Sequence, residues 1–178
     1  MTDSDTLCPP HRRLDGLGID LPDLGPPAYS YDPVSVHGSL LAVSGQISRD
    51  DQGVRCGVVG EDATVADAVA AARISTLNLL SRINESVGLS AVVGVPKLTV
   101  WVASSKEFTD QPAIAETCSK LLLSVLGEAG RHARTALPVH VLPKRALVEL
   151  DALVAVANPG RSEPCVLCGP APHFDRAL

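Results

Sequence analysis

The sequence predicts an α+β domain in which two helices cover one face of a single mixed sheet of about six strands. Short runs rich in Val, Leu and Ala predict the strands, and two segments between residues 64 and 126 repeat their apolar residues with a helical period. The chain of 178 residues has the length of one domain. Residues 1–27 and 158–178 are rich in proline and polar residues, so we expect a flexible arm with at most one short helical turn at RRLDGLGI (12–19), one domain at 28–157 and a disordered tail.

The N-terminal part of the domain predicts a β-hairpin. The turn signal HGS at 37–39 separates two runs rich in Val, Leu and Ala, at 34–36 and 40–48. A third short strand is expected at GVRCGVVG, residues 53–60.

The first helix is expected between residues 64 and 87, where apolar residues return every three to five positions. Thr64 and Asp67 have the spacing of a capping box, and Gly88 predicts the end of the helix.

A buried strand and a second helix follow. The segment KLTVWVAS at 97–104 is rich in β-branched and aromatic residues, which favours a strand. The apolar stripe between residues 110 and 126 predicts the second helix, with Gly127 as its stop.

Residues 132–156 predict a final hairpin of two strands joined by the turn LPKR. Side chains alternate between the two faces of a sheet, so the more apolar half of each strand is expected under the helices. In the first strand this places Thr135, Leu137, Val139 and Val141 under the helices and Arg134, Ala136, Pro138 and His140 on the open face. In the second strand it places Val148, Leu150, Ala152, Val154 and Val156 under the helices and Leu147, Glu149, Asp151 and Leu153 on the open face.

Arg134 and Glu149 are the charges that stand out in this hairpin. In the predicted pairing they are roughly 13 Å apart, too far for one small ligand to touch both. If a second copy of the chain covers the open face, Arg134 of one subunit can meet Glu149 of its neighbour across a cleft. The alternative is an ordinary solvated or interface ion pair.

Composition limits the classes of partner. The net charge is −5 and the isoelectric point about 5.4, so nothing attracts the chain to nucleic acid or to anionic membranes. No apolar run approaches the ~20 residues that span a bilayer, and the N-terminus lacks the order of charges and apolar residues that marks a signal peptide. We therefore expect a cytoplasmic protein without membrane or nucleic-acid partners, with its five cysteines reduced.

The Pro-rich C-terminus holds a possible metal motif. Cys165, Cys168 and His173 have zinc-knuckle spacing, but the fourth ligand position is Leu178. A labile disulfide and a plain tail are the alternatives, and we expect no metal site.

Four blocks of sequence resemble the RidA/YjgF family of enamine/imine deaminases, and most closely its YjgF/chorismate-mutase-like branch. They follow the order of the family and extend the resemblance over about residues 12–157. The blocks are GSLLAVSGQIS at 38–48, EFTDQP at 107–112, GEAGRHARTAL at 127–137 and LPKRALVELDALVAV at 142–156.

The resemblance implies a chorismate-mutase-like protomer in a homotrimer, with sites between subunits. It assigns the carboxylate of a small imine or enamine substrate to Arg134 and the activation of water to Glu149. A guanidinium suits a planar carboxylate, and a partly buried glutamate suits a general base, so neither metal nor organic cofactor is required. The remaining pocket positions implied are Tyr31, Ser44, Gly45, Gln111, His132 and Ala136.

Departures from the family pattern leave other functions open. Ala136 stands where a cysteine is frequent and Pro138 where this branch usually has glycine, which predicts a bulge or a sheet edge there. We expect Gln111 to take the place of the pocket asparagine of the family, although Pro112 falls at the ungapped position. The alternative for His132 is a loop histidine bound to the backbone. A pathway-specific or non-catalytic trimer that binds another small carboxylate is the alternative function, and the acidic charge disfavours a ribonuclease.

Overall fold

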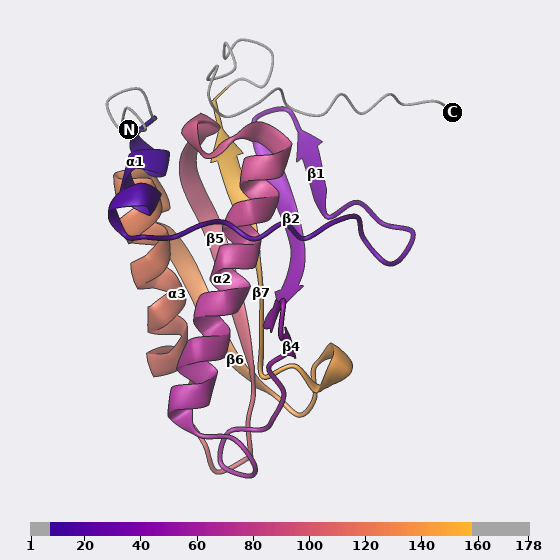
Figure 1. Cartoon of the computed structure of the whole chain (residues 1–178). Helices are drawn as coiled ribbons and strands as arrows, with labels where there is room; N and C mark the ends of the chain where they lie inside the picture. The colour runs from indigo at the N-terminus through magenta and orange to yellow at the C-terminus, as the bar shows by residue number, and fades with distance from the viewer. Residues whose placement is uncertain (1–7, 158–178) are drawn as a thin grey trace.

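The computed structural model describes residues 8–157, and its main feature is a five-stranded mixed sheet (Figure 1). In their order across the sheet, the strands are β1 (Val34–His37), β2 (Leu40–Ile47), β7 (Val148–Val156), β5 (Val92–Ala103) and β6 (His132–Val139). Neighbouring strands are antiparallel except for β5 and β6, which run parallel. The predicted mixed sheet and its first hairpin are confirmed.

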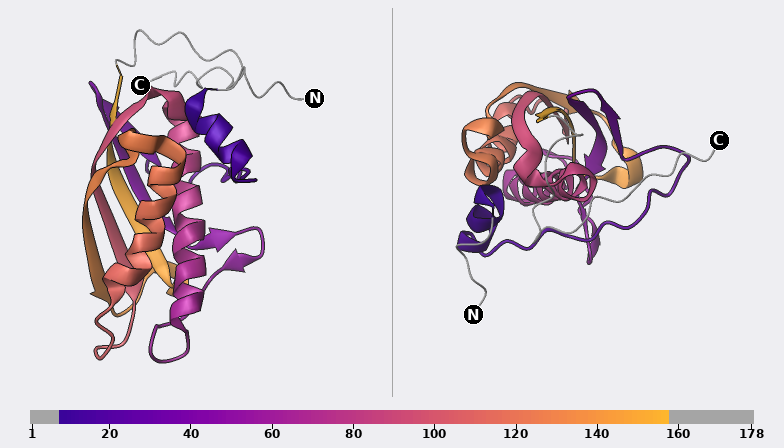
Figure 2. Two further views of the ribbon diagram at one scale, coloured as in Figure 1. Left: turned by 90° about the vertical axis from the view of Figure 1, so that its left-hand side faces the viewer. Right: turned by 90° about the horizontal axis from the view of Figure 1, so that it is seen from above.

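Two helices cover one face of this sheet, as the sequence predicts (Figure 2). They are α2 (Val65–Val87) and α3 (Gln111–Leu126), and among residues 8–157 no helix covers the opposite face. No helix in this part of the chain is long and apolar enough to cross a membrane. Short 3-10 turns lie at η2 (Leu89–Ala91), η3 (Gly127–Gly130) and η4 (Pro143–Arg145).

Both helices begin and end where local sequence signals predict. Thr64 Oγ1 accepts a hydrogen bond from the Asp67 N–H over 3.2 Å, and the Asp67 carboxylate accepts one from the Thr64 N–H over 2.9 Å. This is the predicted capping box. Gly88 and Gly127 cap the C-termini of α2 and α3 with positive φ angles, which glycine adopts without strain.

The N-terminal arm differs from the loose segment that its composition predicts. Residues Pro9–Gly16 form α1, which packs against α3. Leu14 and Ile19 are buried in the hydrophobic core, and Arg13 Nη1 donates a hydrogen bond to the Val125 carbonyl over 3.3 Å. Two well-placed apolar side chains therefore dock a segment whose prolines favour a loop.

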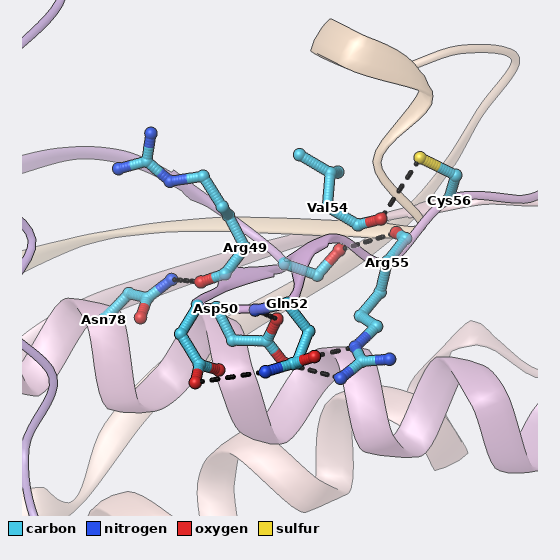
Figure 3. A network of polar contacts seen from close by, with 9 residues as sticks. Arg49, Asp50, Gln52, Val54, Arg55, Cys56 and Asn78 are labelled. Carbon is cyan, nitrogen blue, oxygen red and sulfur yellow. Dashed lines mark hydrogen bonds and ion pairs between the residues drawn. The ribbon is translucent and has the colours of Figure 1, made fainter.

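The third predicted strand does not join the main sheet. Gly53–Val54 (β4) pairs with β3 (Arg49–Asp50) in a separate two-stranded ribbon, and further along the predicted strand Cys56 and Val59 form only isolated bridges, to Ala146 and Ser104. The Asn78 amide on α2 donates a hydrogen bond to the Arg49 carbonyl over 2.8 Å and ties this ribbon to the helix (Figure 3). The ribbon is thereby held beside the end of β2.

The last two strands are not the hairpin predicted for residues 132–156. β5 lies between them and pairs with β6 on one side and β7 on the other. Consequently β6 is an edge strand of the sheet. Proline lacks a backbone N–H, and an edge strand tolerates this because one of its sides has no partner strand. The sheet edge predicted from Pro138 is therefore confirmed.

Two adjacent leucines of α3 give a direct test of the core. Leu122 is fully buried, whereas Leu123 is 39% exposed. We expect Leu122→Ala to lower the free energy of unfolding by about 3 kcal/mol, because it leaves a cavity. Leu123→Ala should cost less than about 1 kcal/mol. Urea denaturation would measure both, and equal losses would contradict the packing of α3.

Candidate functional site

Arg134 points to the helical face of the sheet, and the prediction that it lies on the open face is wrong. It is paired in register with Leu98, a fully buried core residue. The prediction assumed that the more apolar half of the strand faces the helices, yet Leu137 in that half is 42% exposed. An edge strand covers little of the core, so its apolar content does not fix which side faces inward. On β7 the predicted alternation is confirmed.

The guanidinium of Arg134 is held against α3. Its Nη1 donates hydrogen bonds to Ser119 Oγ over 2.9 Å and to Glu116 Oε2 over 3.1 Å. The Arg134 side chain remains 23% exposed, and its Nε and Nη2 have no hydrogen-bond partner within residues 8–157. These donors are available to an anionic ligand.

His132 contacts Ser119, the residue that accepts a hydrogen bond from Arg134. Its Nδ1 lies 2.7 Å from the Gly130 carbonyl and its Nε2 2.9 Å from Ser119 Oγ. Because a carbonyl only accepts, Nδ1 carries the proton and, in the neutral ring, Nε2 accepts from the Ser119 hydroxyl. Ser119 can then accept from Arg134. Both ring nitrogens are engaged within the protomer, so His132 orients Arg134 through Ser119.

A hollow of about 400 Å³ lies further along the same edge, at the ends of β5 and β6. Pro138 lines it, and Ala136 lies between Pro138 and Arg134 on the same side of the strand. Gln111 also lines it from the start of α3, where its Nε2 donates to Ser104 Oγ over 3.0 Å. The edge strand thus carries Arg134 four residues before Pro138, which lines the hollow, so roughly 13 Å of strand separates the two positions.

Glu149 lies on the open face of the sheet, as predicted, and its carboxylate rests on Gly45. A Cβ atom at position 45 would overlap Glu149 Oε1, so a larger residue there would require the Glu149 carboxylate to move. The register of β2 shifts between Val43 and Gln46, which places Ser44 and Gly45 together opposite β7 in a bulge. Bulges of this kind re-aim backbone and side chains beside functional sites.

The environment of Glu149 suits a base. Burial, followed by the nearby negative charge of Asp151, raises the pKa of the Glu149 carboxyl. Burial also raises the pKa of Asp151, while a hydrogen bond from Thr99 and the charge of Lys97 oppose that shift. Two neighbouring carboxyls on one face therefore retain protons more readily than exposed ones.

The predicted site residues fall into two groups at different places in the protomer. The edge group comprises Gln111, His132, Arg134 and Ala136 on α3 and β6, and the bulge group comprises Tyr31, Ser44, Gly45 and Glu149 near β2 and β7. Tyr31 is exposed and lies just before Pro33, whose carbonyl accepts from the Ser44 N–H over 2.9 Å.

The two groups do not meet within one chain. Arg134 pairs with Leu98 and Glu149 with Trp101, three residues further along β5, and the two side chains point to opposite faces. Two strand spacings and three residues separate their Cα atoms by roughly 14 Å. The expectation that one protomer cannot bring both charges to one small ligand holds. The prediction placed both charges on one face of the sheet, whereas in the structure they lie on opposite faces with β5 between their strands.

Three polar residues of these surroundings were not predicted as site residues. Glu116 and Ser119 are one helical turn apart on α3, and Asp151 lies two residues after Glu149 on the same face. The alternation of β7 could have indicated Asp151. Nothing local indicates Glu116 or Ser119, because their importance comes from packing α3 against the edge strand.

Metal ligands are not gathered in the part of the chain that the structure describes. Within residues 8–157, no three His, Cys, Asp or Glu side chains are placed to hold a metal ion. The zinc-knuckle spacing at Cys165, Cys168 and His173 lies outside the described residues.

The sequence and the fold of the chain match a known class of protein. Residues 11–156 match the family model described as "YjgF/chorismate_mutase-like, putative endoribonuclease". The chain belongs to the YjgF/chorismate-mutase-like family.

The chain is also similar to individual proteins over most of its length. Protein TCP17 of Trypanosoma cruzi is 44% identical over 149 residues, which cover 82% of this chain and 93% of that protein. The crystal structure of Atu1372, a protein of unknown function from Agrobacterium tumefaciens, is 38% identical with a TM-score of 0.77 and covers 86% of this chain and 96% of its own. A "putative endoribonuclease" from Shewanella oneidensis is 29% identical with a TM-score of 0.79, covering 84% of this chain and all of its own.

Proposed function

We propose that this protein hydrolyses small 2-imino acids and their enamine tautomers to 2-oxo acids and ammonia, at sites shared between the subunits of a homotrimer. The observation that carries the proposal is the separation of Arg134 from Glu149 within one protomer. Glu149 lies against a glycine bulge, and Arg134 lies on an edge strand whose C-terminal end lines a hollow. A second copy would supply the missing half.

The residue chemistry supports this reaction. Arg134 offers the substrate carboxylate N–H donors that have no partner among residues 8–157, and the raised pKa of Glu149 makes its carboxylate a stronger base. Water activated by Glu149 would add to the C=N carbon, and the amine would then leave as ammonia. The reaction needs no group beyond these side chains and water.

The direct test is the release of ammonia from 2-iminopropanoate generated in situ by a serine dehydratase. We expect the protein to remove the imine faster than buffer does, and a series of 2-imino acids would define the preferred side chain. If small carboxylates bind but no imine is consumed, the chain is a carboxylate-binding trimer. Ala136 at the position of a frequent cysteine makes that second function the main competitor.

Ribonuclease activity is a weaker candidate, although the family description names it. The net charge of −5 provides little attraction for RNA. We expect no RNA binding in a gel-shift assay even at low salt, where electrostatic attraction is strongest.

The activity should depend on pH through Glu149. Because the base must be deprotonated, we expect kcat/KM to fall on acidification at a pH above the ordinary glutamate pKa of about 4.3. Asp151→Asn removes one cause of the raised pKa and leaves burial in place, so the acid limb should move to lower pH. A pH profile of both proteins measures this, with Asp51→Asn as the surface control, and an unmoved limb would contradict the coupling.

A further inference from the structure

We propose that Glu116 makes the Arg134 site selective for zwitterions, so that it holds the imino acid substrate and repels the oxo acid product. This inference rests on the proposed function, because it concerns the charge of the ligand that Arg134 binds. The observation behind it is the ion pair between Arg134 and Glu116, with Nη1 and Oε2 3.1 Å apart at the open edge of the sheet.

Each partner of this ion pair has polar atoms that the pair does not use. Arg134 uses only Nη1 for Glu116 and Ser119, and its Nε and Nη2 have no partner within the described chain. Glu116 uses Oε2, while its Oε1 has no partner among the same residues, and its side chain is 49% exposed. A ligand can therefore meet two donors and one acceptor without breaking the ion pair.

A 2-imino acid has the complementary pattern of charge. Its carboxylate would accept from the free donors of Arg134, and its protonated imino nitrogen, one carbon away, would donate to Glu116. Hydrolysis adds one water, breaks the C=N bond and releases the nitrogen as ammonium, which leaves a 2-oxo acid with only a negative charge. The product then lies beside Glu116 without a cation to offset it, and like charges repel.

Arg134 does not depend on Glu116 for its position. Ser119 Oγ accepts from the same Nη1 over 2.9 Å, and His132 holds Ser119 in turn. Ser119 is buried, whereas Glu116 is largely exposed. Replacing Glu116 should therefore change the charge beside the guanidinium and leave the guanidinium in place.

Binding of two stable ligands tests the inference without any turnover. L-Alanine carries both charges of the imino acid, and pyruvate carries only the carboxylate. We expect Glu116→Gln to bind L-alanine about fivefold more weakly and pyruvate about fivefold more tightly, the scale of a partly exposed charge pair. Titration calorimetry of the intact protein measures both. Glu128→Gln, an exposed glutamate paired with Arg131, is the matched control and should change neither affinity.

Opposite changes for the two ligands separate selectivity from simple damage. A disturbed site would weaken both ligands, and affinities that move together or stay unchanged in Glu116→Gln would overturn the role of Glu116 while leaving the proposed function intact. Binding of neither ligand by the unaltered protein would instead remove the carboxylate site at Arg134, and this inference with it.

Discussion

Replacement of Arg134 by alanine is expected to lower kcat/KM for 2-iminopropanoate by about 100-fold or more, because hydrogen bonds between charged groups are each worth ~1.5–3 kcal/mol. Two donor nitrogens of the guanidinium have no partner in the described part of the chain, and alanine has no such donor. Ammonia release and imine decay, measured together, report the loss. Binding of pyruvate should weaken in parallel, since the same carboxylate contact is removed.

Arg131→Ala is the matched control for this variant. Arg131 is three residues earlier, exposed, and paired only with Glu128 among the described residues. Its replacement should leave turnover within about twofold of the unaltered protein, as surface changes usually do. Equal losses in the two variants would indicate a general effect of charge, and full activity in Arg134→Ala would end the assignment of the carboxylate site.

Local signals account for the parts of the fold that were predicted correctly. The capping box at Thr64 and Asp67 and the stop at Gly127 act within one helical turn, so neighbouring residues alone specify them. Strand pairing has no such local signal. The order that inserts β5 between β6 and β7 depends on a parallel crossover through α3, which adjacent residues do not encode.

The same limit explains the error at Arg134. Alternation along β7 was predicted correctly because this strand is central and its inward residues, such as Leu150, are fully buried. On the edge strand β6 the two faces differ less in burial. The position of α3 therefore decides which face of this strand turns toward the helices. Gly45 shows a different case, because the resemblance implied it only as a pocket position, and its contact with the Glu149 carboxylate is known from the structure.

Mixing two inactive variants should restore activity if the sites are shared between subunits. Glu149→Gln is expected to lose about 100- to 10,000-fold in kcat because it removes the proposed general base. Arg134→Ala lacks the carboxylate anchor, so each variant alone is inactive for a different reason. In a mixed trimer, one interface would join an intact Arg134 from one subunit to an intact Glu149 from its neighbour.

Co-expression of the two variants with different affinity tags, followed by purification on both tags, selects mixed trimers. In a closed ring of three, both possible compositions contain one such interface, so we expect about one third of the activity of the unaltered protein. A partner that carries both substitutions, mixed with Arg134→Ala, contains no intact Arg134 and should stay inactive. The separation of the two side chains by β5 makes this recovery a direct consequence of the proposed assembly. If mixed trimers remain as inactive as their parents, the site lies within one subunit and Glu149 is not its base.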